Sequence, residues 1–222
     1  MLLVAADTSG KHGSIALAHA NDDGTCSVIE TFSLEGNAFS AQLVPQISAL
    51  LSKRRFDKKE VGGFVVVSGP GSFTGLRVGL AAIKALAEVL QKPIAAVSLL
   101  EAVALASGLQ GKILAALDAG RRQIYVGEYK VSSAGAVRLS ERLLARDEFA
   151  KLVFGSTVLS PDSGIAEIAR SSGAAVQIIE VPTADLIAKV GWKKILSGET
   201  VSPEELEANY MSRSADIFPK QA

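Results

Sequence analysis

The sequence predicts an α/β protein made of two similar halves, and three observations lead to this fold. Three strand-like runs precede the first helical segment, which is typical of an antiparallel meander. Residues 69–79 then join an apolar run to a long stretch of helix formers, in the order strand, glycine loop, helix. Finally, the apolar strand 2–7 ends in Asp and small residues, and residues 113–120 repeat that pattern. A chain of 222 residues with 48% hydrophobic residues can bury one large core or two small ones.

Each element of the first half follows from local patterning. We expect strands at 2–7, 13–20 and 25–33, a helix at 38–54, a strand at 63–68, a helix at 75–90, a strand at 94–97 and a helix at 99–107. Turn residues at 9–10 and 21–24 separate the first three strands. Pro45 falls inside the first helix and is expected to kink or restart it. This order of elements describes an RNase H-like half.

The second half begins with a strand that resembles the first strand of the chain. Leu2 to Ser9 can be laid over Ile113 to Gly120, and both segments are apolar strands that end in Asp followed by small residues. A duplicated fold explains this likeness, and chance similarity of two buried strands is the alternative. Two RNase H-like halves with an Asp on each first hairpin are the pattern of the actin, hexokinase and Hsp70 class. We therefore expect domains at 1–108 and 109–198, the second smaller, and a tail at 199–222 that packs back on the first domain.

Composition excludes several classes of function. The 23 basic and 23 acidic residues cancel, so there is no overall positive charge to attract nucleic acid or membranes. The basic run Lys53–Arg55 with Lys58 and Lys59 is the one candidate patch, and a solvated helix end is its other interpretation. Cys26 is the single cysteine, which excludes an internal disulfide and a multi-cysteine zinc site. The apolar start at 2–6 is too short for a signal peptide or a membrane span, which favours the cytoplasm.

Several motifs together resemble those of one known family. The motifs are the string Gly69-Pro70-Gly71-Ser72-Phe73-Thr74-Gly75-Leu76-Arg77-Val78-Gly79, Asp7-Thr8-Ser9, Leu43-Val44-Pro45, Asp118-Ala119 ahead of Tyr125, and Asn209-Tyr210. This set resembles the TsaB (YeaZ) family, which acts in making threonylcarbamoyladenosine in tRNA. The resemblance independently implies the actin-like fold.

The resemblance also implies a role within a complex. Such a protein is a non-catalytic subunit that pairs with TsaD, which transfers the threonylcarbamoyl group to N6 of the adenosine beside the tRNA anticodon. The ATPase TsaE is a further expected partner, and the chain is expected to form a homodimer when TsaD is absent. No cofactor is expected in the isolated chain, because ATP and metal belong to the partner subunits. Binding of tRNA is expected only as part of the complex.

The glycine loop and the helix after it are the candidate partner interface. The loop lacks the spacing of a P-loop or of a dinucleotide-binding loop. The helix from 76 to 90 has few charges and many small residues, which favours close approach of a partner helix or burial within its own domain. Pattern and resemblance together give the predicted interface: Gly71, Ser72, Phe73, Thr74, Gly75, Arg77, Gly79, Ala82 and Leu86.

The two hairpin aspartates have two interpretations. In ATP-using members of the actin class, residues at these positions serve phosphates and a metal ion. Asp7, Thr8, Ser9 and Asp118 are therefore a possible vestigial phosphate loop, although an Asp at a strand end also caps the turn through backbone N–H groups.

Two other functions compete with the partner-subunit hypothesis. The hairpin aspartates support an ATP-dependent small-molecule kinase or ATPase of the same fold. A metallopeptidase is disfavoured, because His12 and His19 lie seven residues apart on either side of a strand and cannot share an ion. We predict no catalytic residue and no metal site in this chain.

Overall fold

The structure is a computed structural model that describes residues 1–35 and 38–211. Contacts between residues divide the chain into two compact units. Of the described residues, the first unit comprises 1–35, 38–99 and 182–209, and the second comprises 100–181 with 210 and 211. Within the described residues, no helix is both long and apolar enough to cross a membrane.

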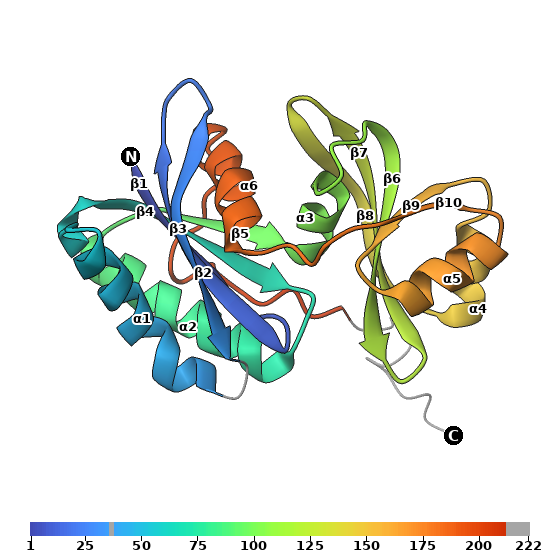
Figure 1. Cartoon of the computed structure of the whole chain (residues 1–222), viewed down its shortest axis with the longest axis horizontal. Helices are drawn as coiled ribbons and strands as arrows, with labels where there is room; N and C mark the ends of the chain where they lie inside the picture. Colours follow the sequence, from blue (N-terminus) through green and yellow to red (C-terminus); the bar gives the residue numbers. More distant parts are fainter. Residues whose placement is uncertain (36–37, 212–222) are drawn as a thin grey trace. The chain divides into compact units, whose positions relative to one another are not determined.

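The first unit is a five-stranded mixed sheet covered by helices on both faces (Figure 1). Its elements are β1 (Leu2–Asp7), β2 (His12–Ala20), β3 (Cys26–Glu35), α1 (Phe39–Lys53), a 3-10 turn (Lys58–Glu60), β4 (Val61–Gly69), α2 (Phe73–Leu90), β5 (Ile94–Ser98) and α6 (Ala184–Leu196). The strand order is β3-β2-β1-β4-β5. Strands β1, β2 and β3 pair antiparallel, and β4 and β5 continue the sheet parallel to β1.

Alternation along the central strands supplies a core on each face of this sheet. Val4 and Ala6 of β1 join the main core beneath α1 and α2. The opposite face carries α6, where a Cβ on Gly191 would lie 2.1 Å from Cγ1 of Val65, so only glycine fits. Trp192 of α6 is buried, and its indole N–H donates to the carbonyl of Asn21 at 3.0 Å.

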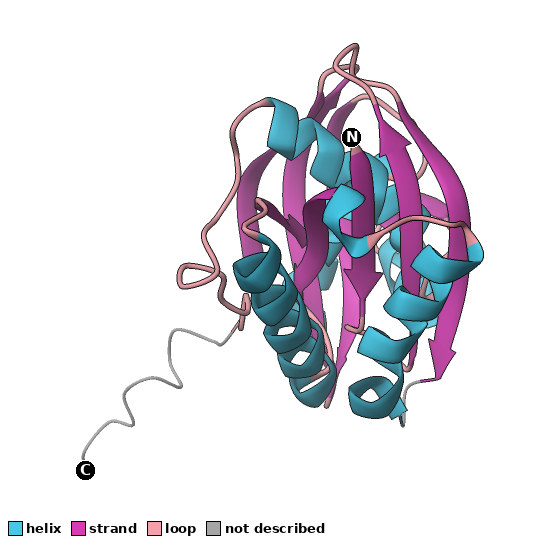
Figure 2. Ribbon diagram, turned by 90° about the vertical axis from the view of Figure 1, so that its left-hand side faces the viewer, coloured by secondary structure: helices cyan, strands magenta, loops and turns pink. Residues whose placement is uncertain are grey.

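The second unit repeats the arrangement with its own five strands (Figure 1), and Figure 2 views the chain from the side of the first unit. Its elements are α3 (Leu99–Leu105), β6 (Gly111–Gly120), β7 (Gln123–Ser132), β8 (Gly135–Ala145), α4 (Arg146–Leu152), β9 (Thr157–Ser160), α5 (Ser163–Ser171) and β10 (Ala175–Ile178). The order β10-β9-β6-β7-β8 is the order of the first sheet, because β6, β7 and β8 pair antiparallel and β9 and β10 run parallel to β6. The repeated topology confirms the prediction of two RNase H-like halves.

The unit boundaries differ from the expected positions at 108 and 198. Leu100 and Val103 of α3 pack with Ile113 and Leu159, so α3 belongs to the core of the second unit. Helix α6 follows the last strand of the second sheet but packs on the first. The helix after the fifth strand of each half therefore covers the sheet of the other half, and sequence spacing alone does not show which sheet a helix covers.

Residues 199–209 of the tail pack on the first unit. The backbone N–H of Val201 donates to the carbonyl of Ile94 at 2.9 Å, and Leu206 is buried in the main core. Asn209 then donates its backbone N–H to the carbonyl of Ser68 at 2.7 Å, beside the glycine loop. The rest of the expected tail, residues 212–222, lies outside the described residues. Helix α1 continues through Pro45 as one helix, so it does not restart there, which was one of the two expected effects of this proline.

Candidate functional site

The glycine loop connects β4 to α2 at the carboxyl end of the first sheet. Ser72 caps α2, because its Oγ accepts a hydrogen bond from the backbone N–H of Gly75 at 3.3 Å. Gly69 has a φ of +136°, a backbone conformation that residues with a side chain rarely adopt. A Cβ at this position would also lie 2.7 Å from the carbonyl oxygen of Asn209. The loop is therefore held between the first helix turn of α2 and the described end of the tail.

The remaining glycines of the motif face the end of β1. A Cβ on Gly71 would lie 2.5 Å from the carbonyl oxygen of Ser9, and one on Gly75 would lie 2.0 Å from that of Thr8. A Cβ on Gly79 would lie 2.3 Å from Thr8 Oγ1. These distances leave no room for a side chain at any of the three positions. The glycine pattern thus lets α2 rest directly on the backbone of the first hairpin.

Hydrogen bonds join the same two segments. Thr8 Oγ1 donates to the carbonyl of Gly75 at 2.7 Å, although a helix carbonyl normally accepts only backbone N–H groups. The backbone N–H of Ser72 donates to the carbonyl of Ser9 at 2.7 Å. A backbone N–H that could have held an anion is therefore used within the chain.

Asp7 is the buried carboxyl of this site. It is 5% exposed, and its Oδ1 accepts hydrogen bonds from Ser9 N at 2.8 Å and Ser9 Oγ at 2.6 Å. Burial raises the pKa of the Asp7 carboxyl above its ordinary value, and the Ser9 hydrogen bonds oppose that rise. The contacts are those of a turn cap, which was one of the two interpretations of this residue.

Asp7→Asn is expected to change the pH dependence of stability. A raised pKa in the folded state means that folding takes up a proton, so the free energy of unfolding falls as pH rises above the ordinary value of 3.8 toward the folded pKa. Asparagine keeps the oxygen that accepts from Ser9 and removes the charge. We expect the variant to be at least as stable as the original protein at pH 7. Urea unfolding of both proteins from pH 4 to pH 8 measures this difference. The expectation is contradicted if the variant, compared with the original protein at the same pH, is more destabilised at pH 8 than at pH 4.

Asp118 occupies the matching position in the second unit. Its Oδ1 accepts from the backbone N–H of Gly120 at 3.1 Å, the same two-residue spacing as Asp7 with Ser9. Its own backbone N–H donates to Asp162 Oδ2 at 3.0 Å, at the start of α5. Unlike Asp7, it is exposed. The two halves thus build similar hairpin caps from an Asp, and each cap lies within its own unit.

The predicted interface residues of α2 do not share one face. Phe73, Thr74 and Arg77 are exposed, with Phe73 at 54%, and the Arg77 guanidinium lies 3.7 Å from the centre of the Phe73 ring. Gly75 and Gly79 are instead buried against Thr8. The structure therefore shows that part of the predicted set packs within its own unit.

The rest of the predicted set lies between these extremes. Ser72 is exposed and Gly71 is half-buried. Ala82 and Leu86 are half-buried and pack against the main core. Four further residues of α2 are exposed and were not in the predicted set: Ala81, Ala85, Glu88 and Val89.

Helix α1 also carries exposed residues and was missing from the predicted set. It packs beside α2 on the same face of the sheet (Figure 1). We give the name α1–α2 face to five of the exposed residues on these two helices, Ala41, Val44, Ser48, Ala81 and Ala85. Residues 39–52 contain no charged side chain, which is unusual for an exposed helix and is the signal that could have identified it.

The two histidines lie at opposite ends of one strand. His12 begins β2 and His19 is its second-last residue, and both are exposed. Seven residues of strand separate them by roughly 23 Å. Across residues 1–35 and 38–211, no group of three or more His, Cys, Asp or Glu side chains is placed to hold a metal ion.

Comparison with known proteins gives consistent matches. Residues 34–199 match the model of the family described as TsaD, tRNA N6-adenosine threonylcarbamoyltransferase. The chain is 36% identical over 132 residues to the tRNA threonylcarbamoyladenosine biosynthesis protein TsaB of Bacillus subtilis, a match covering 59% of this chain and 56% of that protein. It is 26% identical to the protein of the same name from Escherichia coli, over 95% of this chain and 94% of that one. The match to the Bacillus protein thus spans about half of that protein's length.

Solved structures show the same fold. An uncharacterized protein with similarity to peptidase YeaZ, from Pseudomonas aeruginosa, superposes with a TM-score of 0.79 at 25% identity, over 95% of this chain and 99% of that one. A structure of YeaZ from Pseudomonas aeruginosa gives a TM-score of 0.75 at 24% identity, over 94% of this chain and all of the other.

Proposed function

Since this chain belongs to the TsaD family, as one of its TsaB (YeaZ) members, we propose that it acts in making threonylcarbamoyladenosine in tRNA. We propose further that it is a non-catalytic subunit that pairs with TsaD. In that complex TsaD transfers the threonylcarbamoyl group to N6 of the adenosine beside the anticodon. ATP and metal act on the partner subunits, and TsaE joins the assembly.

The observation that carries the pairing proposal is the α1–α2 face. Its five defining residues are small or uncharged and are exposed in the isolated chain. Small side chains allow helices to approach closely, so a pair of helices from a partner of the same fold is the expected occupant. A second copy of this chain presents the same two helices, which supports a homodimer when TsaD is absent.

The packing around Asp7 supports a non-catalytic role. Thr8, Ser9 and the glycine loop are joined by hydrogen bonds and by contacts too close for a side chain. Asp7 itself accepts two hydrogen bonds from Ser9. On this proposal, the hairpin that serves phosphates in ATP-using relatives of the fold here serves to position α2.

Reconstitution of the modification reaction tests the proposal. We expect the chain to co-purify with TsaD from the same organism, and TsaD with TsaE, ATP, threonylcarbamoyl adenylate and tRNA to form the modified nucleoside only when the chain is added. Mass spectrometry of digested tRNA measures the product. Modified nucleoside formed by the chain alone would contradict the non-catalytic role, and full activity without the chain would contradict the proposed function itself.

A thermal-shift titration with Mg-ATP separates this role from that of a kinase or ATPase. The Ser72 N–H already bonds to Ser9, and the glycine loop rests on the hairpin, so we expect Mg-ATP at 1 mM to leave the melting temperature of the free chain unchanged. A rise of several degrees that is lost in Asp7→Ala would favour the kinase hypothesis.

A further inference from the structure

Positive charge is concentrated at the end of α1 and in the residues that follow it. Residues 53–60, which we call the basic segment, contain Lys53, Arg54, Arg55, Lys58 and Lys59. All five are exposed. Because the whole chain has no net charge, a local excess of this kind is a distinct feature of its surface.

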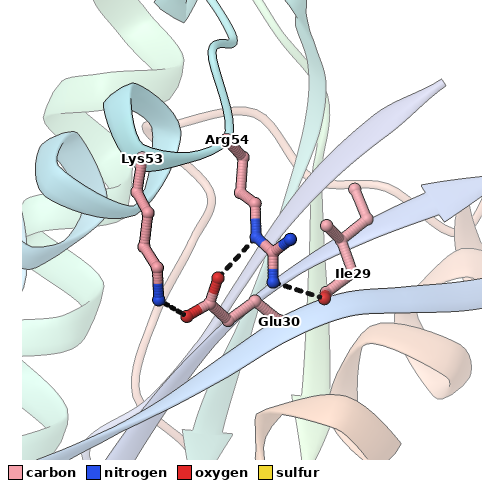
Figure 3. A network of polar contacts seen from close by, with 4 residues as sticks. All are labelled: Ile29, Glu30, Lys53 and Arg54. Carbon is pink, nitrogen blue, oxygen red and sulfur yellow. Dashed lines mark hydrogen bonds and ion pairs between the residues drawn. The ribbon is translucent and has the colours of Figure 1, made fainter.

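One carboxylate from a neighbouring strand holds two of these cations (Figure 3). Glu30 of β3 accepts from Lys53 Nζ through Oε1 at 2.5 Å and from Arg54 Nε through Oε2 at 2.5 Å. Arg54 also reaches the carbonyl of Ile29 at 3.5 Å. These hydrogen bonds lower the pKa of Glu30, so it stays ionised and fixes both basic side chains against β3.

The acidic residues within the basic segment are engaged by its own backbone. Asp57 Oδ1 accepts from the backbone N–H of Lys59 at 2.8 Å, and Glu60 Oε2 accepts from that of Asp57 at 2.6 Å. Together they form a capping box that fixes the 3-10 turn. Among the described residues, no acidic side chain forms an ion pair with Arg55, Lys58 or Lys59. Five basic side chains against Glu30, Asp57 and Glu60 leave an excess of two positive charges on exposed side chains.

Phe56, which follows Arg55 in the basic segment, belongs to an aromatic pair. The ring of Phe56 meets the ring of His19 from β2 edge to face, with centroids 5.6 Å apart. His19 is exposed, whereas Phe56 is half-buried and packs against the main core. Phe56 therefore contacts the ring of an exposed aromatic residue.

We propose that the basic segment, together with His19, binds the phosphate backbone of RNA. This inference rests on the proposed function, which places a tRNA near the protein. Arg55, Lys58 and Lys59 supply charge-assisted contacts to phosphates, and the exposed imidazole offers a face on which an unpaired base can stack. An acidic protein segment could meet the cations but would make no use of the aromatic ring, so RNA is the favoured ligand.

Charge reversal at the two free lysines is the first test. Binding of a fluorescently labelled tRNA transcript is measured with the full chain and with its complex with TsaD, at 50 to 200 mM KCl. For Lys58→Glu/Lys59→Glu we expect at least about tenfold weaker binding and a salt dependence shallower by roughly 1.5 in log–log slope, because about two phosphate contacts are lost. The matched control is Lys130→Glu/Lys151→Glu, two exposed lysines of the second unit, and we expect it to bind within about twofold of the original protein.

The second test frees Lys53 and Arg54 from their ion pairs with Glu30 and is expected to strengthen tRNA binding rather than weaken it. Glu30→Gln removes the carboxylate that neutralises Lys53 and Arg54, so binding is expected to tighten by about threefold with a steeper salt dependence. A melting curve of each variant shows that the fold is kept.

Three results would overturn the proposal: equal loss of binding in the control double variant, no change in Lys58→Glu/Lys59→Glu, or no detectable tRNA binding by either chain or complex. Poly-glutamate and poly-uridine are compared at equal charge as competitors of the labelled tRNA. If poly-glutamate competes as well as poly-uridine, the surface binds acidic proteins, and the RNA proposal is overturned. Failure of the proposed function can be distinguished from failure of the RNA-binding proposal. If the modification reaction proceeds fully without the chain while the two lysines still govern tRNA binding, the function is wrong and the RNA surface stands.

Discussion

Ala85→Arg is expected to abolish co-elution with TsaD while the melting temperature of the isolated chain stays within about 2 °C of the original. Ala85 is an exposed residue of α2 and belongs to the α1–α2 face. In the complex, arginine at this position would place a large cation in a closely packed apolar contact, which costs about 3 kcal/mol or more and weakens association at least about 100-fold. In the free protein the same side chain extends into water, where surface substitutions change stability by roughly 0.5 kcal/mol or less.

Ala87 and Ser171 serve as control positions, and Ser48 provides a second test of the face. Ala87 lies two residues further along α2 but is 1% exposed, so Ala87→Arg should unfold the chain rather than only block pairing. Ser171→Arg adds the same cation at an exposed position of α5 and should leave both properties unchanged. Ser48→Arg tests the α1 side of the face and should behave like Ala85→Arg.

Size-exclusion chromatography of the mixed proteins and differential scanning fluorimetry give the two readouts. Co-elution that survives in both Ala85→Arg and Ser48→Arg would show that TsaD binds elsewhere. Self-association of the free chain, followed by light scattering, should be lost in the same variants if the homodimer uses the same two helices.

The fold was predictable because both halves carry their periodicity in the sequence. Leu2 to Asp7 is apolar and ends in a turn-forming Asp, and the predicted counterpart that ends at Asp118 has the same features. The observed strands β1 and β6 occupy the same central position in their sheets, each antiparallel to the next strand. Periodicity of this kind involves residues that are close in the sequence, so a single sequence is enough to predict the elements.

The orientation of α2 was not predictable in the same way. Small residues occur on all sides of this helix, and a helix without a wide polar stripe does not indicate which side faces the sheet. Gly79 was expected to face a partner but contacts Thr8, and Ala81 is exposed instead. The side of α2 that faces the sheet is decided by its tertiary contact with the end of β1. That contact joins Gly75 to Thr8, which lies more than 60 residues earlier in the sequence. The buried and exposed sides of α1 were easier to separate, since Leu43, Ile47 and Leu50 follow helical spacing.

Gly75→Ala is expected to destabilise the protein by about 3 kcal/mol, a fall in melting temperature of roughly 6 to 12 °C for a chain of this size. The added Cβ would lie 2.0 Å from the carbonyl oxygen of Thr8, an atom of the backbone that cannot rotate away. Alanine is the better helix former, so the strain must exceed a favourable propensity of about 1 kcal/mol before any loss is seen. Gly164→Ala in α5 isolates that propensity, because nothing lies within 4 Å of its Cβ position, and it should stabilise the protein by about 0.5 to 1 kcal/mol.

Gly79→Ala completes the argument, because its obstacle is a side-chain atom rather than the backbone. Its Cβ would lie 2.3 Å from Thr8 Oγ1, and the next atoms of Thr8 are 3.5 Å away or more. Thr8→Ala removes that oxygen, so the double variant should recover at least about 1 kcal/mol relative to the sum of the two single changes, whereas Thr8→Ala should recover nothing in Gly75→Ala. Chemical denaturation of the five variants and the original protein measures these differences. If Gly75→Ala were as stable as the original, α2 would be able to shift away from the hairpin. In that case the glycines of the motif would have to be explained by something that approaches the loop from outside the chain.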